Sequence, residues 1–173
     1  MNNQFQVRGP DYGLIFRNLL IGLVTLIPAM SSFGTVGAGE RGVRLRFAAV
    51  TGSVLDEGLY FQIPFVERVV TMSVQIEKYE ASADAASKDL QSVSTTVAVN
   101  YHLDPARVDS VYQEFREQYR VRIIEPSIQE SVKSAIARYT AEELITKRAL
   151  VRDDIKANVK EKIEPNGIIL DEL

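Results

Sequence analysis

Residues 93–105, VSTTVAVNYHLDP, contain the change of pattern that decides the fold. Up to Leu103 the apolar side chains recur at every second position, and a period of two is typical of a half-buried strand whose polar face meets solvent or a partner. Asp104 and Pro105 then change the pattern, because aspartate is a preferred helix N-cap and proline is tolerated at the first helical position. The sequence therefore predicts a strand followed by a helix. The inward positions of the strand are Val93, Thr95, Val97, Val99, Tyr101 and Leu103.

The part of the chain before this switch favours strands. Residues 43–47 and 70–76 alternate apolar and polar side chains, and residues 58–65 (GLYFQIPF) form an aromatic-rich run that is closed by a proline. Residues 81–88 (ASADAASK) are small and polar, so they are expected to form a connector.

The part of the chain after the switch favours helices. Apolar residues recur at helical spacing after Pro105 and again after Pro126. Thr140 and Glu143 match a capping box, which predicts a short third helix.

A fourth helix is expected to be capped by Thr146 and to end at residues 165–167 (PNG), and residues 168–170 then favour a last short strand. Because strands come first and helices follow, the fold class is α+β with antiparallel strands rather than a doubly wound parallel sheet.

A long uncharged segment lies near the N-terminus. Residues 18–39 contain no charged side chain, and residues 19–30 (LLIGLVTLIPAM) are densely apolar. A membrane helix needs roughly 20 apolar residues, and Arg17 near its end can extend its side chain to the headgroups. The predicted membrane-anchor residues are Leu14, Ile15, Phe16, Leu19, Leu20, Ile21, Leu23, Val24, Leu26 and Ile27.

This apolar segment has three possible roles, as a retained membrane helix, a cleaved signal peptide or a buried globular helix. The leader up to Arg17 is long for a signal peptide, and no clear small-x-small cleavage site follows the apolar core. We therefore expect a single membrane helix within residues 1–37, followed by a folded domain over residues 38–173. Arginines lie on both sides of the segment, so charge alone leaves its orientation open.

The composition excludes several kinds of site. The chain has no cysteine and one histidine, which removes thiolate chemistry and histidine-rich zinc sites. The formal net charge of -3 gives no indication of nucleic-acid binding. No cofactor, metal or catalytic residue is expected.

Two short motifs have simpler explanations than a ligand site. Gly37, Gly39 and Gly42 match the spacing of a dinucleotide fingerprint, but that mechanism needs a helix after the glycines, whereas a strand is expected here. His102 and Asp104 would provide two metal ligands without a third, so His102 is expected to be an ordinary surface histidine.

Three charged stretches are expected to be solvated helix faces. The pairs Glu142–Glu143 and Asp153–Asp154 have cationic neighbours, which argues against paired acid–base catalysis. Residues 116–122 (REQYRVR) contain a tyrosine that could stack on a base, but the interleaved glutamates favour a solvated face.

The predicted fourth helix has a narrow apolar stripe flanked by lysines and glutamates. Such a helix packs either on its own sheet or against a neighbouring subunit. The candidate subunit-contact residues are Val151, Ile155, Val159 and Ile163.

Several segments carry a family resemblance by their order along the chain. They are residues 38–43 (AGERGV), 57–64 (EGLYFQIP), 87–91 (SKDLQ), 124–151 (IEPSIQESVKSAIARYTAEELITKRALV) and 167–172 (GIILDE). Together they resemble the SPFH (band 7) superfamily, and within it the prohibitin family.

This resemblance implies an SPFH domain that an N-terminal helix holds at a membrane. It also implies that subunits, alone or with a paralogue, assemble into large rings or cages that organise lipids and modulate membrane-bound AAA+ proteases. The family usually continues into a long coiled coil, which is therefore expected beyond residue 173. The expected location is a bacterial plasma membrane, with the domain on the translocated side, and the alternative is the mitochondrial inner membrane.

Two other functions are weighed against the scaffold. One is a subunit of a membrane protease or enzyme complex, for which Asp89 and Glu142 would be the residues to mutate. The other is a monomeric module that binds lipid without higher assembly.

Overall fold

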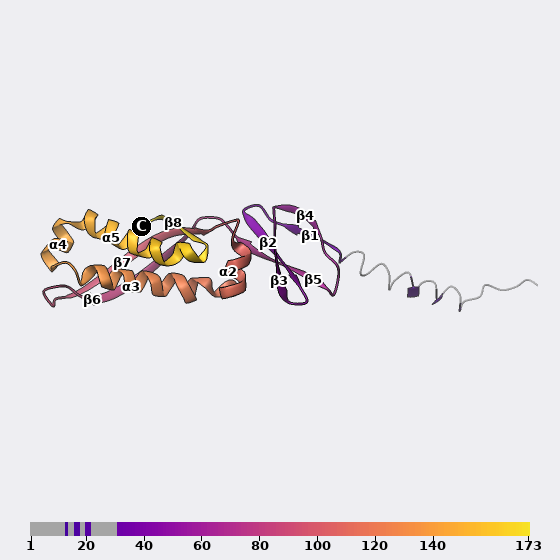
Figure 1. Ribbon diagram of the computed structural model, residues 1–173, viewed down its shortest axis with the longest axis horizontal. Helices are drawn as coiled ribbons and strands as arrows, with labels where there is room; N and C mark the ends of the chain where they lie inside the picture. Colours follow the sequence, from indigo (N-terminus) through magenta and orange to yellow (C-terminus); the bar gives the residue numbers. More distant parts are fainter. Residues whose placement is uncertain (1–12, 14–15, 18–19, 22–30) are drawn as a thin grey trace, which may run out of the picture.

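The structure, a computed structural model, describes residues 13, 16–17, 20–21 and 31–173. Figure 1 shows an elongated arrangement with strands β1–β5 (within residues 33–73) towards one end. Strands β6–β8 and helices α3–α5 (within residues 77–103 and 125–172) lie towards the other end, and α2 (Val108–Phe115) lies between the two groups. We call these groups the first lobe (β1–β5) and the second lobe (β6–β8 with α3–α5).

The first lobe is built from two small antiparallel sheets. Strands β1 and β4 form one sheet, and β2 lies between β3 and β5 in the other. On the inward face of the smaller sheet the Tyr60 ring lies over Gly34, where any Cβ would collide with it. The strands are β1 (Phe33–Val36), β2 (Glu40–Arg46), β3 (Ala49–Leu55), β4 (Gly58–Phe61) and β5 (Glu67–Ser73).

The second lobe is organised around one long strand. β7 (Ser92–Leu103) lies between β6 (Glu77–Ala86) and β8 (Ile168–Glu172), and all neighbours are antiparallel. β6 pairs with β7 over all ten of its residues, whereas β8 pairs only with the last part of β7, Asn100–Leu103.

The helices follow β7 in the order predicted from the sequence. Pro126 lies in the first turn of α3, and Thr140 and Glu143 form the predicted capping box at the start of α4. Gly167, with a φ of 79°, provides the left-handed residue that ends the last helical turn. The helical elements are α2 (Val108–Phe115), the 3-10 turn η1 (Arg116–Gln118), the π-helical turn η2 (Arg120–Ile124), α3 (Glu125–Ile136), α4 (Ala141–Thr146), α5 (Arg148–Ile163) and the 3-10 turn η3 (Glu164–Asn166).

The core lies between the second sheet and its helices. Helices α3 and α5 contact each other, and they contact the sheet through β6 and β8. The inward side chains of β7 from Val97 onward are buried, while Ser94, Thr96 and Ala98 on the opposite face are exposed. This alternation confirms the predicted half-buried strand and the α+β class. Fully buried members of the core include Val99, Tyr101, Leu103, Val108, Val111, Ile124, Ile128, Val132, Val159, Ile163 and Ile168.

One predicted connector is wrong. Residues 81–88 fall mostly within β6, which continues to Ala86. Ala81 and Ala83 are buried there against the core, and α3 packs on this strand. Helix α3 lies close to the sheet at this point, so small side chains fit between the two. The small residues that are typical of a linker therefore allow helix–sheet packing here. Strand β3 also has no counterpart among the predicted strands.

Two predicted helix caps are wrong as well. The Asp104 carboxylate accepts a hydrogen bond from the Ala106 N–H at 3.0 Å, and α2 begins only at Val108. The Thr146 hydroxyl donates to the Glu142 carbonyl at 2.9 Å, so it closes α4 rather than starting α5. Asp104 thus closes a turn that precedes α2, and the Thr146 hydroxyl bonds a carbonyl of the preceding helix.

The stripe Val151, Ile155, Val159 and Ile163 lies in the core of the second lobe. These side chains are at most 7% exposed, so they have almost no free surface. Of the two alternatives for this helix, packing on its own domain is the one observed. A contact between α5 and another subunit stays a prediction and would have to use the exposed face of the helix.

The predicted membrane anchor falls mainly outside the described residues. Leu14, Ile15, Leu19, Leu23, Val24, Leu26 and Ile27 lie outside them, whereas Phe16, Leu20 and Ile21 are helical and exposed. No helix within the described part of the chain is long and apolar enough to cross a membrane. Strand β1 lies within residues 1–37, so the folded domain begins before residue 38.

The burial of α5 leads to a stability prediction. Ile163→Ala should lower the free energy of unfolding by about 2–5 kcal/mol, because it leaves a cavity in the core. Leu150→Ala is the matched control, since Leu150 lies on the same helix and is 60% exposed, whereas Ile163 is fully buried. Urea unfolding followed by circular dichroism measures both. Equal losses for the two variants would contradict the assignment of this stripe to the core.

Candidate membrane-facing surface

The outward face of the β1–β4 sheet is apolar. Phe33 and Phe61 are paired across the two strands, with ring centroids 5.6 Å apart in an edge-to-face arrangement. Their exposed fractions are 59% and 55%, and Leu59 on the same face is 74% exposed. A half-buried sheet normally turns polar residues outward, whereas this sheet also turns Phe33, Leu59 and Phe61 outward.

The chain that follows β4 extends this apolar face. The Gln62 N–H donates to the Ser32 carbonyl at 2.8 Å, and its side-chain amide donates to the Ser31 carbonyl at 3.2 Å. These bonds tie Gln62 to Ser31 and Ser32, which directly precede β1. Ile63 and Phe65 are exposed beyond them, and Phe65 is the more extreme at 92%.

We call Phe33, Leu59, Phe61, Ile63 and Phe65 together the entry surface. A further exposed phenylalanine, Phe47, lies in the turn between β2 and β3, where its N–H donates to the Val66 carbonyl at 2.9 Å, and it lines a hollow together with Phe65. Single exposed apolar residues are common, but several aromatic ones in one place indicate a surface that is covered in the functional state.

A buried carboxylate fixes the turn that presents Phe65. The side chain of Glu67 is only 2% exposed and forms an ion pair with Arg46 at 2.7 Å. It also accepts the Ile63 N–H at 3.1 Å, and Arg44 lies 3.9 Å from the second oxygen. The Arg46 hydrogen bond, together with the Ile63 N–H, holds the pKa of Glu67 below its ordinary value.

The chemistry of the entry surface fits lipid. Phe33 and Phe61 lie close to Ser31 and Ser32, which follow the predicted membrane anchor in the sequence. A neighbouring bilayer would remove these side chains from water, and burial of apolar surface contributes roughly 25 cal/mol per Å². From the sequence alone, the aromatic run at residues 58–65 was predicted to be an ordinary strand. Its alternation places Leu59 and Phe61 on one face, but the sequence pattern does not tell whether another element covers that face.

A polar network at the junction of β6, β7 and η2 was also missed. The Arg120 guanidinium donates to the Tyr101 hydroxyl at 3.0 Å and forms an ion pair with Glu77, to which that hydroxyl also donates. Burial raises the pKa of Tyr101 to about 12, although the bond from Arg120 opposes the shift. Neighbouring Tyr119 is buried, so residues 116–122 are not the fully solvated face expected from the sequence, and this tyrosine is not available to stack on a base.

The remaining candidates take structural roles. His102 Nδ1 lies 2.8 Å from Asp171 rather than beside Asp104, and in the described part of the chain no three potential ligands gather around a metal position. Asp89 accepts bonds from the Ser87 hydroxyl and the Ala141 N–H, which lower its pKa and tie its loop to α4. The bond from the Ala141 N–H places Asp89 beside Ala141, the residue that precedes Glu142 at the start of α4.

The acidic pairs also have ordinary partners. Glu143 completes the capping box and pairs with Lys147 at 2.8 Å. Asp153 pairs with Arg152 and Asp154 with Arg138. The three glycines at 37, 39 and 42 lead into β2, so no helix follows them.

A family model and several known proteins are similar in sequence to this chain. The family model described as "SPFH domain / Band 7 family" matches residues 35–173. Prohibitin 1 of Gallus gallus is 31% identical over 144 residues, which cover 83% of this chain and 53% of that protein. "Prohibitin-7, mitochondrial" of Arabidopsis thaliana is 30% identical over 165 residues, which cover 95% of this chain and 59% of that protein.

A third relative is named "Mitochondrial prohibitin complex protein 1", from Caenorhabditis elegans, and is 27% identical over 146 residues. The chain spans about half the length of the curated relatives it matches. The resemblance inferred from the sequence segments is confirmed by these matches.

The Glu67 cluster predicts a pH dependence of stability. Because the folded-state pKa is lowered, the contribution of Glu67 is complete above its ordinary value of 4.5 and is lost as the pH falls through the lowered folded value. Glu67→Gln should therefore destabilise the domain at neutral pH and flatten the loss of stability on acidification. Urea unfolding over a pH series measures this. Glu161→Gln, at an exposed position of α5, is the control and should keep the wild-type profile; a Glu67→Gln profile parallel to the wild type would contradict the account.

Proposed function

This chain belongs to the SPFH domain / Band 7 family, and on that basis we propose that it is a membrane-anchored scaffold rather than an enzyme. The observation that supports this most directly is the entry surface, because its exposed aromatic side chains adjoin the uncharged N-terminal segment. An anchor and an apolar surface in the same place would let the first lobe rest on the bilayer.

The proposed anchor is a single membrane-spanning helix that contains the apolar residues 19–30. Two features of the sequence support it, the absence of charge over residues 18–39 and the tolerance of an arginine at the end of such a helix. The folded domain would lie on the translocated side, as the family resemblance implies. Membrane lipids are then the first partner.

The kind of membrane is part of the proposal. Two of the relatives described above carry mitochondrial names, which makes the mitochondrial inner membrane a candidate. The bacterial plasma membrane, which the sequence analysis preferred, receives no support from these relatives.

We further propose that copies of the chain, alone or with a paralogue, assemble side by side into a ring or cage. Such an assembly would organise a patch of membrane and modulate a membrane-bound AAA+ protease, as the family resemblance implies. Because the apolar stripe of α5 is used in the core, the contact between subunits must use other surfaces, such as the exposed, charged face of α5. One relative is named as a protein of a prohibitin complex, which agrees with assembly.

The entry surface also fits a second function, that of a monomeric module that binds lipid. The entry surface would serve this function equally well, because it needs no second copy. The two functions differ in particle size, so a measurement of mass in mild detergent separates them.

The anchor can be tested by placing a charge within it. Val24→Arg should shift the protein from the membrane fraction to the alkali-extractable fraction, because an arginine at the centre of a membrane helix costs about 2.5–3.5 kcal/mol. Phe16→Arg is the matched control, because an arginine near the helix end can reach the headgroups and should leave the protein in the membrane. Fractionation after extraction with high salt and alkali measures both.

The same samples test assembly. Solubilised in mild detergent, the wild-type chain should run as a particle many times the mass of one subunit. A wild-type chain that is released by salt alone would contradict the anchor, and a particle of one subunit would favour the lipid-binding module over the scaffold.

A further inference from the structure

The β2–β3 hairpin places a phenylalanine where its backbone favours a smaller residue. Arg46 pairs with Ala49, so Phe47 and Ala48 are the two central residues of the turn. Their φ angles are 49° and 66°, and a hairpin turn with two positive φ angles is usually built from asparagine and glycine. Phe47 therefore holds an unfavourable backbone conformation, and its side chain is nonetheless 76% exposed.

The turn between β4 and β5 repeats this combination. The Val66 N–H donates to the Ile63 carbonyl at 3.3 Å, which closes a four-residue turn with Pro64 and Phe65 at its centre. A positive φ at the third position of a turn, here 66°, is normally adopted by glycine or asparagine. Phe65 thus combines a left-handed backbone with an exposed aromatic ring. Departures of this kind from local preference are typical of residues that serve function rather than stability.

Both phenylalanines line the same hollow, whose volume is about 760 Å³. Strands β2, β3 and β5 and helix α2 contribute to its walls, and Figure 1 shows α2 beside this end of the first lobe. Of the five non-glycine residues with a positive φ in the described part of the chain, four line the hollow: Phe47, Ala48, Phe65 and Arg116. Unfavourable backbone conformations are therefore concentrated around one site.

The charge that the hollow offers to an occupant is positive. Arg68 and Arg116 line it and are exposed, and neither has a carboxylate within ion-pair distance among the described residues. Glu67 is the only carboxylate in this lining, and it is buried and already paired. Glu114 and Glu117, which are close to Arg116 in the sequence, do not line the hollow. An anionic group would supply the two arginines with a partner.

The hollow is continuous with the entry surface, because Phe65 belongs to both. Aromatic side chains are common at the level where acyl chains meet headgroups, and arginines near a membrane surface attract anionic lipids. A free anion would use the arginines but would leave Phe47 and Phe65 exposed to water. A phospholipid uses both kinds of side chain, so it is the occupant that fits this combination.

We propose that this hollow binds the headgroup of an anionic phospholipid. Arg68 and Arg116 contact the phosphate, while Phe47 and Phe65 lie against the upper part of the acyl chains. The inference rests on the proposed membrane function and adds a selection by lipid charge to it. The first lobe then prefers a patch of membrane that is rich in anionic lipid.

The test uses the full chain with Phe47→Trp in a mild, uncharged detergent. The chain contains no tryptophan, so the emission of this variant reports on the hollow alone. Titration with dihexanoyl phosphatidylglycerol, an anionic short-chain lipid, should shift the emission to the blue in a saturable way. Dihexanoyl phosphatidylcholine has the same acyl chains and no net charge. It should bind more weakly by roughly tenfold or more, because each arginine beside an anionic headgroup contributes about fivefold.

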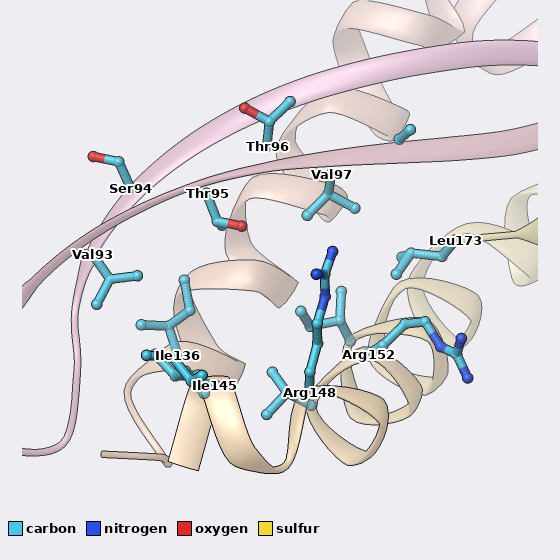
Figure 2. Close-up of a pocket in the computed structure, with 14 residues that line it drawn as sticks. Val93, Ser94, Thr95, Thr96, Val97, Ile136, Ile145, Arg148, Arg152 and Leu173 are labelled. Carbon is cyan, nitrogen blue, oxygen red and sulfur yellow. The ribbon is translucent and has the colours of Figure 1, made fainter. Parts of the chain in front are cut away.

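Two variants in the Phe47→Trp background test the arginines. Arg68→Gln and Arg116→Gln should each weaken binding of the anionic lipid by about fivefold and leave binding of the neutral lipid unchanged. Arg148→Gln is the matched control and should bind as its parent does. Arg148 is also exposed, but it lies in the second lobe, where Figure 2 shows it in a different groove beside β7. Circular dichroism checks that each variant is folded.

Three results would overturn the proposal. The first is equal affinity for the two lipids, or no saturable response to either. It would leave the proposed anchor and scaffold intact, because extraction with salt and alkali tests those separately. The second is displacement of the lipid by inorganic phosphate at an equal concentration, which would indicate a site for a free anion. The third is emission that is already blue-shifted without lipid and responds to neither lipid, which would indicate that a second copy covers the hollow.

Discussion

The pairing of β6 with β7 is the constraint on which the rest of the molecule depends. Ten consecutive pairs, from Glu77 with Tyr101 to Ala86 with Ser92, fix which face of β7 turns inward. A slip of one residue would turn every side chain of the strand to the other face. With the register fixed, Val99, Tyr101 and Leu103 form the surface on which α3 and α5 pack.

In the first lobe, the same alternation of side chains leaves an apolar face exposed. In β1 and β4 the inward face is filled by Val36 and by the Tyr60 ring over Gly34, and the apolar side chains that remain are turned outward. The buried Glu67 carboxylate then holds the turn that carries Phe65. Glu67 thus holds the turn in place, and the phenylalanines provide the exposed apolar surface of this lobe.

Much of the fold could be predicted from the sequence, because β7, the capping box at Thr140 and the apolar stripe of α5 have strong local periods. The connector over residues 81–88 was wrong because small residues favour both linkers and close helix–sheet packing, and only the tertiary contact with α3 separates the two. The predicted caps at Asp104 and Thr146 were wrong because Asp104 closes a turn before α2 and Thr146 bonds a carbonyl of the preceding helix, α4. The entry surface could not be found because exposure of Phe33 and Phe61 depends on which neighbours cover a strand, and that information is not local.

The central claim is that the entry surface rests in a bilayer. The chain contains no tryptophan, so Phe65→Trp gives a single fluorescent reporter on that surface, and Ile145→Trp gives a matched reporter in the other lobe. In vesicles whose acyl chains carry bromine, a heavy-atom quencher, the account predicts blue-shifted and strongly quenched emission for Phe65→Trp and unquenched emission for Ile145→Trp. Emission from Phe65→Trp that stays red-shifted and unquenched would contradict it.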